Sequence, residues 1–150
     1  MKTNLCLPQL LLLALLVLAS CKSQRYAPDQ LPENQLVFGD GGGFTGAVTR
    51  YILLENGQLF KHYSLDDSMT DLGSMSKREA RTYFKEIENL QLAQKQISQP
   101  GNVYYFLEHR SGDQTARCTW GDSDYQTDQS LLEMHRKLIA QVRQMKGIEQ

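Results

Sequence analysis

The sequence predicts a single small α+β domain, with an antiparallel sheet of about four or five strands and two helices packed on one face. Three observations support this. Segments rich in β-branched and aromatic residues lie between turn residues in both halves of the chain. Two longer segments carry apolar residues at helical spacing. The predicted domain, residues 35–147, is long enough for one hydrophobic core but too short for two domains.

The first predicted strand is short, Leu36–Phe38, and the glycine-rich segment Gly39–Gly46 follows it as a turn or bulge. A phosphate-binding loop is excluded here, because no Gly-Lys-Ser/Thr motif and no helix pattern follow the glycines. Residues 48–54 predict a second strand with apolar side chains on both faces, which indicates a central position in the sheet. Asn56-Gly57 then predicts a hairpin to a third strand, residues 58–63.

The first predicted helix begins after Ser76-Lys77-Arg78-Glu79, which has the form of a capping box. Its apolar face consists of Ala80, Tyr83, Phe84, Ile87 and Leu90. The second predicted helix is capped by Asp128 or Thr127 and ended by Gly147. Its apolar stripe consists of Leu131, Met134, Leu138, Val142 and Met145.

A second hairpin is predicted between the two helices. Residues 103–108 give the strongest strand pattern in the chain, and residues 114–120 pair with them across Ser111-Gly112-Asp113. Two polar segments are expected to form connections without regular structure. They are the exposed loop Asp66–Asp71 and the connector Gln91–Asn102.

The N-terminal segment has the pattern of an export signal. Lys2 precedes the apolar block Leu10–Ala19, which is about half of the roughly 20 residues that a membrane-spanning helix needs. Leu18-Ala19-Ser20-Cys21 closes this block and resembles the lipobox of bacterial lipoproteins. The resemblance implies a signal peptide over residues 1–20, removed on export, and a Cys21 that carries a diacylglycerol and further acyl chains such as palmitate.

The predicted lipid anchor defines the localisation that we expect. More than one acyl chain on Cys21 would hold the protein stably on a membrane. Lys22 stands where inner-membrane lipoproteins of enteric bacteria tend to have aspartate, so we expect the outer membrane, which borders the periplasm. Residues 21–34 are polar, contain Pro28 and Pro32, and predict a flexible lipidated tether. Fully extended, this tether would reach roughly 45 Å from the membrane.

Charge and cysteine content narrow the range of functions and covalent links that the chain can have. The chain has 16 Lys and Arg against 17 Asp and Glu, which is too balanced for a protein that binds nucleic acid. Of its three cysteines, Cys6 leaves with the signal peptide and Cys21 is the predicted acylation site. Cys118 then has no partner for a disulfide.

Two groups of residues are candidates for chemistry. Cys118 would need a base such as His62, His109 or His135 to act as the nucleophile of a hydrolase. It shares a strand face with Ala116 and Trp120, however, which favours a buried and inert thiol. The acidic segment Asp122–Asp128 has oxygen ligands at several positions of a calcium-binding loop, but a helix-capping turn explains it more simply. We therefore predict a protein that is not an enzyme and has no cofactor or small-molecule substrate.

The order of elements is similar to that of emfourin, a family of small inhibitors of thermolysin-like metallopeptidases. The likeness rests on Gly42-Gly43-Phe44-Thr45-Gly46, on the helix that starts at Met75-Ser76-Lys77, and on the late strand with Tyr104-Tyr105-Phe106. It implies a non-catalytic protein-binding module, in its most specific form a protease inhibitor. A structural or accessory subunit of an envelope assembly is the alternative. The predicted binding residues are Gly42, Gly43, Phe44 and Gly46.

Overall fold

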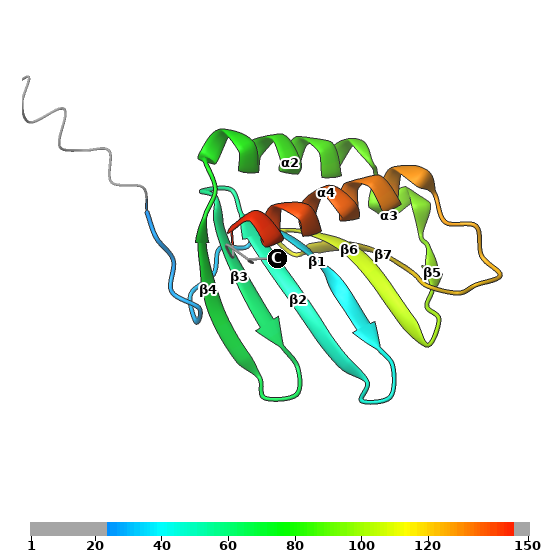
Figure 1. Ribbon diagram of the computed structural model, residues 1–150. Coiled ribbons are helices and arrows are strands. Elements are labelled where there is room, and N and C mark those ends of the chain that lie inside the picture. Colours follow the sequence, from blue (N-terminus) through cyan, green and yellow to red (C-terminus); the bar gives the residue numbers. More distant parts are fainter. Residues whose placement is uncertain (1–23, 146–150) are drawn as a thin grey trace, which may run out of the picture.

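A seven-stranded sheet organises residues 24–145, the part of the chain that the computed structural model describes (Figure 1). The strand order is β4-β3-β2-β1-β6-β7-β5. The strands are β1 (Gln35–Gly42), β2 (Ala47–Leu54), β3 (Gln58–Tyr63), β4 (Ser68–Ser74), β5 (Ser98–Gln99), β6 (Val103–Ser111) and β7 (Gln114–Trp120). The helices are α2 (Lys77–Asn89), α3 (Leu92–Lys95) and α4 (Gln129–Met145). The predicted single α+β domain is confirmed.

The sheet is mixed and larger than the sequence predicts. Neighbouring strands are antiparallel except β5 and β7, which are parallel. The prediction of an antiparallel sheet with about four or five strands is therefore wrong in the number of strands and at one edge. The additional strands, β4 and β5, form the two edges, where mostly exposed residues pair with a neighbour on one side only. The predicted central position of β2 is confirmed.

Both additional strands lie in segments that the sequence predicts as irregular. The predicted loop Asp66–Asp71 ends inside β4, whose Met69 and Leu72 pack against the cores on opposite faces of the sheet. The predicted connector Gln91–Asn102 contains α3 and β5, and its Leu92 is buried in the core. A few apolar contacts to the sheet thus order segments whose composition is polar.

Strand β1 is also longer than predicted and includes the first glycines of the glycine-rich segment. A Cβ on Gly39 would lie 1.9 Å from the carbonyl oxygen of Thr49 on β2. Only a residue without a side chain lets the two strands pair this closely. The glycine at this position therefore extends the strand, where the sequence predicts a turn.

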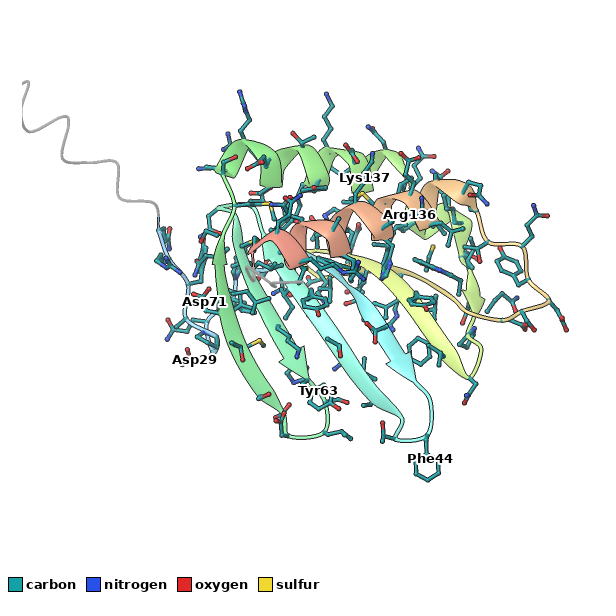
Figure 2. The ribbon with its side chains drawn as sticks, in the orientation of Figure 1. Asp29, Phe44, Tyr63, Asp71, Arg136 and Lys137 are labelled. Carbon is teal, nitrogen blue, oxygen red and sulfur yellow. The ribbon has the colours of Figure 1, made fainter. Side chains whose placement is uncertain are left out.

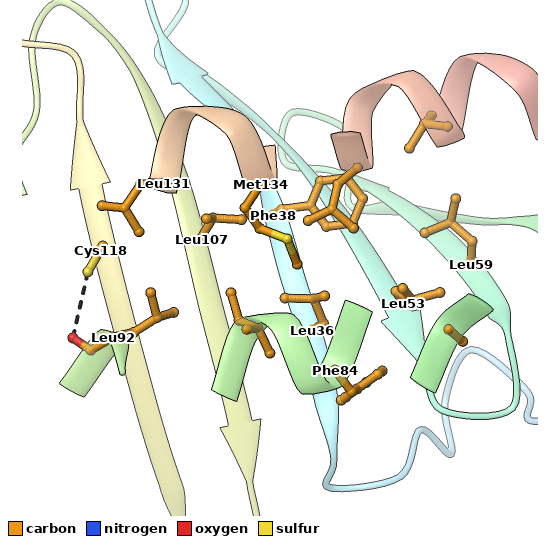
Figure 3. Close-up of a cluster of buried hydrophobic side chains, with 14 of the residues drawn as sticks. Leu36, Phe38, Leu53, Leu59, Phe84, Leu92, Leu107, Cys118, Leu131 and Met134 are labelled. Atoms are coloured by element: carbon orange, nitrogen blue, oxygen red, sulfur yellow. Dashed lines mark hydrogen bonds between the residues drawn. The ribbon is translucent and has the colours of Figure 1, made fainter. Parts of the chain in front are cut away.

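The two long helices lie on the same face of the sheet (Figure 1). The apolar cluster between sheet and helices is the larger of the two cores, and Figure 3 shows most of it. The sheet contributes Leu36, Phe38, Leu53, Leu59, Leu107, Cys118 and Trp120. The helices contribute Ala80, Phe84, Ile87, Leu131, Met134, Leu138 and Val142. These positions follow the predicted apolar stripes, so burial of those stripes holds the helices in place.

Both long helices have a polar cap at their N-terminus. The backbone N–H of Glu79 donates to Ser76 Oγ at 3.2 Å, and the N–H of Ser76 donates to Glu79 Oε2 at 3.1 Å. The predicted capping box is confirmed. Before α4, the N–H of Ser130 donates to Asp128 Oδ1 at 2.8 Å. These caps satisfy backbone donors that a helix start leaves without partners.

The opposite face of the sheet carries a smaller core, and part of the N-terminal segment, residues 24–34, packs on it. The core consists of Val37, Ile52, Leu54, Phe60 and Phe106. Tyr26 and Leu31 of the N-terminal segment pack against it. The sequence predicts a flexible tether over residues 21–34, whereas the structure packs residues 24–34 on the domain. The predicted signal peptide, Cys21 and Gly147 lie outside the described residues.

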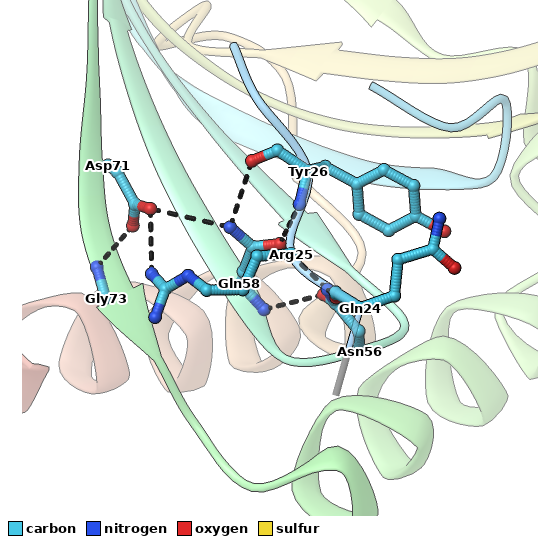
Figure 4. Close-up of polar contacts among 7 residues, drawn as sticks. All are labelled: Gln24, Arg25, Tyr26, Asn56, Gln58, Asp71 and Gly73. Carbon is cyan, nitrogen blue, oxygen red and sulfur yellow. Dashed lines mark hydrogen bonds and ion pairs between the residues drawn. The ribbon is translucent and has the colours of Figure 1, made fainter. Parts of the chain in front are cut away.

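A buried glutamine holds the N-terminal segment in place (Figure 4). Gln58 is 1% exposed, and its Oε1 accepts from the backbone N–H of Tyr26 at 2.7 Å. Its Nε2 donates to the carbonyl oxygen of Tyr26 at 3.2 Å. On either side, Asn56 Nδ2 donates to the Gln24 carbonyl at 2.6 Å, and Arg25 forms a 2.9 Å ion pair with Asp71. The backbone of Tyr26 is therefore hydrogen-bonded to the domain through both its N–H and its carbonyl oxygen, much as a residue of an additional strand would be.

Candidate functional site

The predicted binding residues meet at the turn between β1 and β2. Phe44 is the most exposed large apolar residue among those described, at 107% of its reference area. Figure 2 shows it at the tip of the hairpin, pointing away from the domain. An aromatic side chain that contacts nothing in its own domain gains no folding energy at this position. We call the segment Gly43–Gly46 the hairpin tip.

The hairpin tip is held by backbone hydrogen bonds. The N–H of Gly43 donates to the Asn102 carbonyl at 2.7 Å, and the N–H of Gly46 donates back to the Gly43 carbonyl at 3.3 Å. Gly43 and Gly46 have φ angles of 70° and 65°, which favour glycine. Gly42 lies one residue earlier, at the end of β1, where a Cβ would be 2.1 Å from the Asn102 carbonyl oxygen. The glycines therefore shape the backbone, and Phe44 is the side chain they present.

Two further exposed apolar residues lie at the same end of the sheet. Leu65, in the turn between β3 and β4, is 58% exposed, and Val103, at the start of β6, is 48% exposed. The β3–β4 turn is tied to β2, because the N–H of Ser64 donates to the Val48 carbonyl at 3.0 Å. Val103 pairs directly with Gly42. We call Phe44, Leu65 and Val103 the tip surface; of these three residues, the sequence predicts only Phe44 as a binding residue.

Cys118 has the environment of a structural thiol. It is completely buried, and its Sγ donates to the Leu92 carbonyl at 3.6 Å (Figure 3). Burial raises the pKa of this thiol, which disfavours the thiolate that a nucleophile needs. His62, His109 and His135 hydrogen-bond elsewhere, to Asp67, Asn34 and the Gly39 carbonyl. None of the hydrogen bonds of the described residues joins Cys118 to a histidine.

Carboxylates of the acidic segment Asp122–Asp128 are engaged in its own turn, at the start of α4 and with Lys95 of α3. Asp122 Oδ1 accepts from the N–H of Asp124 at 2.9 Å, and Asp128 forms an ion pair with Lys95. The Lys95 ammonium and the Ser130 side chain lower the pKa of Asp128 to about 2. Within residues 24–145, no three His, Cys, Asp or Glu side chains are grouped to hold a metal ion. The predicted capping turn accounts for these contacts.

A pocket of about 490 Å³ lies between α4 and the ends of β6 and β7. His135 packs edge-on against Tyr105 and Trp120, with ring centroids 5.5 Å and 5.6 Å away, and Leu132 and Ile139 complete the apolar wall. Burial lowers the pKa of His135, so the ring is neutral near pH 7. The sequence does not predict this pocket, because its residues come from three elements that are far apart in the chain.

The chain matches no protein-family model, and no curated protein is significantly similar to it. Among the described residues, no helix has the length and apolarity that crossing a bilayer would require. The sequence patterns and the geometry of the hairpin tip are therefore the observations from which a function can be argued.

Proposed function

We propose that the protein is a lipoprotein anchored on the outer membrane of the cell envelope, and that its domain is a non-catalytic module that binds another protein through the tip surface. The exposure of Phe44 on a turn with a fixed backbone is the observation that carries this proposal. Aromatic side chains are enriched among the residues that dominate protein interfaces. Burying a phenylalanine that water now surrounds would contribute about 1.5–3 kcal/mol to binding.

The rigidity of the turn adds to this argument. A side chain on a flexible loop loses conformational freedom when it binds, which weakens the complex. The turn carrying Phe44 is tied to Asn102 on a separate segment by the 2.7 Å hydrogen bond from Gly43. The turn is therefore already ordered when the domain folds, so little conformational freedom is lost on binding. More of the free energy gained by burying Phe44 then contributes to affinity.

The lipid anchor rests on the sequence of residues 1–21, which lie outside the described part of the chain. Leu18-Ala19-Ser20-Cys21 follows a short apolar block and resembles a lipobox. Metabolic labelling with a fatty acid tests this feature directly. We expect label on the wild-type protein and none on the Cys21→Ser variant. A wild-type protein that takes up no label would overturn the anchor.

The most specific form of the proposal is inhibition of a thermolysin-like metallopeptidase, because the glycine-phenylalanine motif resembles that of emfourin. The test is peptidase activity at increasing concentrations of the mature protein. We expect inhibition by the wild type, and an inhibition constant about 30-fold higher for Phe44→Ala, as for a dominant interface residue. Thr45→Ser, a neighbouring change that keeps the hydroxyl bonded to Ala47, should inhibit like the wild type. Equal inhibition by wild type and Phe44→Ala would contradict a role for the tip.

A structural or accessory role in an envelope assembly is the second candidate, and the edge strand β4 favours it. β4 pairs with β3 on one side only, so its other edge could accept a strand from a partner. Arg25 of the N-terminal segment forms an ion pair with Asp71 of this strand. The two candidates differ in the residues they need, since strand addition at β4 would not depend on Phe44. A hydrolase that uses Cys118 is disfavoured by the burial of the thiol.

A further inference from the structure

The N-terminal segment leaves the domain at a defined point, beside the start of α2. The Gln24 carbonyl is hydrogen-bonded to Asn56, in the turn between β2 and β3. Arg25 and Asn56 line the same surface hollow as Ser74 and Lys77, and Lys77 is the first residue of α2. The path from the domain toward Cys21 therefore starts next to the N-terminal turn of α2.

This exit point limits how far the domain can move from Cys21. With the chain fixed at Gln24, three residue steps separate it from Cys21, a span of at most about 10 Å. If residues 21–34 were all free, the reach would be roughly 45 Å. On the proposed lipid anchor at Cys21, on which this inference rests, the domain is therefore held close to the membrane surface.

The outward side of α2, close to this exit point, is basic. Arg78, Arg81 and Lys85 are exposed and recur every three to four residues, so they share one side of the helix, which we call the basic ridge. None of the ion pairs in the described part of the chain involves these three residues. Their charges are thus available to an external anion.

The acidic residues of α2 offset only part of the charge of the basic ridge, with Glu79 beside Arg78. Glu79 is engaged in the capping box with Ser76, and Glu86 lies 3.5 Å from Lys137 of α4. Glu88 is exposed near the C-terminal end of the helix. On α4, Lys137 is shared between Glu86 and Glu133, and the exposed Arg136 and Arg143 add positive charge to the same layer.

We propose that the basic ridge lies on the anionic phospholipid headgroups of the membrane that anchors Cys21, so that the protein has one fixed orientation on that membrane. Each basic residue near an anionic membrane surface strengthens binding roughly five-fold. The short span from Gln24 to Cys21 keeps the ridge at a high local concentration over the lipid. Figure 2 shows Phe44 at the far end of the hairpin from α2, so this orientation presents the tip surface away from the membrane.

The test uses the mature lipidated protein reconstituted into vesicles that contain about one-third phosphatidylglycerol, with a fluorescence quencher on the lipid headgroups. A fluorophore is attached at Thr82→Cys, on the outward side of α2, or at Thr45→Cys, on the hairpin tip. We expect strong quenching at position 82 and little at position 45. In vesicles of phosphatidylcholine alone, or in high salt, quenching at position 82 should fall.

Two variants test separately the charge of the basic ridge and the length of the tether. Changing Arg78, Arg81 and Lys85 together to Glu should weaken the oriented state by 100-fold or more, on the order of a factor of five for each lost positive charge. The matched control, Arg78→Lys with Arg81→Lys and Lys85→Arg, keeps the charges and should be quenched like the wild type. A flexible insert of about ten Gly and Ser residues between Ser23 and Gln24 keeps the ridge and the Gln58 contacts, and should reduce quenching by lengthening the tether.

The outcomes for the anchor and for the orientation are distinguishable. A wild-type protein that does not float with the vesicles would overturn the lipid anchor and this inference together. A protein that floats, but whose label at position 82 is quenched no more than the label at position 45, would leave the anchor in place and overturn the orientation. Quenching at position 82 that does not depend on anionic lipid would overturn the role of the basic ridge.

Discussion

The side-chain amide of Gln58 pairs with the backbone of Tyr26, accepting its N–H at 2.7 Å and donating to its carbonyl oxygen at 3.2 Å. The same amide makes two further hydrogen bonds: its Oε1 accepts from Asn56 Nδ2 at 2.8 Å, and its Nε2 donates to Asp71 Oδ2 at 3.4 Å. A single buried side chain thus connects the N-terminal segment to β3 and β4. It determines where the chain leaves the domain, and with that the distance between the domain and Cys21.

Replacing Gln58 by Leu should release the N-terminal segment. The backbone N–H and carbonyl of Tyr26 would lose their partners, which we expect to lower the free energy of unfolding by about 2 kcal/mol. Trypsin should then cleave after Arg25 much faster than in the wild type. Gln114→Leu, at an exposed position of β7, is the matched control and should change stability by less than about 0.5 kcal/mol. An unchanged cleavage rate in Gln58→Leu would show that other contacts hold the segment.

Phe44→Ala should leave stability unchanged, because the ring contacts nothing in the domain. We expect its midpoint of chemical unfolding to match that of the wild type. Phe38→Ala is the contrasting variant, since Phe38 is 1% exposed and stacks on Tyr51, and it should lose about 3–5 kcal/mol. A large loss of stability in Phe44→Ala would place the ring in a packed position and remove it from the proposed binding surface.

Cys118 should react slowly with thiol reagents in the folded protein. Its side chain is fully buried, and burial raises the pKa of the thiol, so the folded state offers little thiolate to a reagent. We expect native labelling at least about 100-fold slower than labelling in denaturant, since it requires opening of the core. The exposed Thr82→Cys site provides a fast-reacting comparison in the same protein. Rapid native labelling of Cys118 would revive the hydrolase alternative.

Asp128 should make stability depend on pH in the acidic range. Its folded pKa is about 2, below the ordinary aspartate value of 3.8, because Lys95 and Ser130 stabilise the carboxylate. A lowered folded pKa contributes stability that is present above pH 4 and lost as the pH falls toward 2. After allowance for solvent screening, we expect Asp128→Asn to lower the free energy of unfolding by about 1 kcal/mol at pH 7. The difference from the wild type should shrink below pH 4 and disappear as the pH falls through 2, and a constant difference would contradict this assignment.

Elements with short-range signals agree with the sequence prediction. The hairpin at Asn56-Gly57 and the capping box of Ser76 and Glu79 depend on residues next to one another, so their patterns suffice. The apolar stripes of α2 and α4 likewise predict which side of each helix is buried. The exposed position of Phe44 was also predictable from the sequence, because glycines on both sides of it favour a turn.

Features formed by distant residues were not predictable in the same way. Strand β4 gains its order by pairing with β3, and its own residues are mostly polar and exposed. The docking of the N-terminal segment depends on Gln58, a residue type that carries no local signal for burial. The pocket around His135 combines β6, β7 and α4, whose relative placement follows only from the complete sheet.

Capture of partners by the tip surface tests the central proposal most directly. Residues 22–150, coupled to beads without lipid, would be exposed to envelope extract from the host, and bound proteins would be quantified by mass spectrometry for wild type and Phe44→Ala. We predict at least one envelope or secreted protein that the wild type retains and Phe44→Ala loses, with Thr45→Ser behaving as wild type. Identical sets of proteins on wild type and Phe44→Ala beads would contradict binding through Phe44.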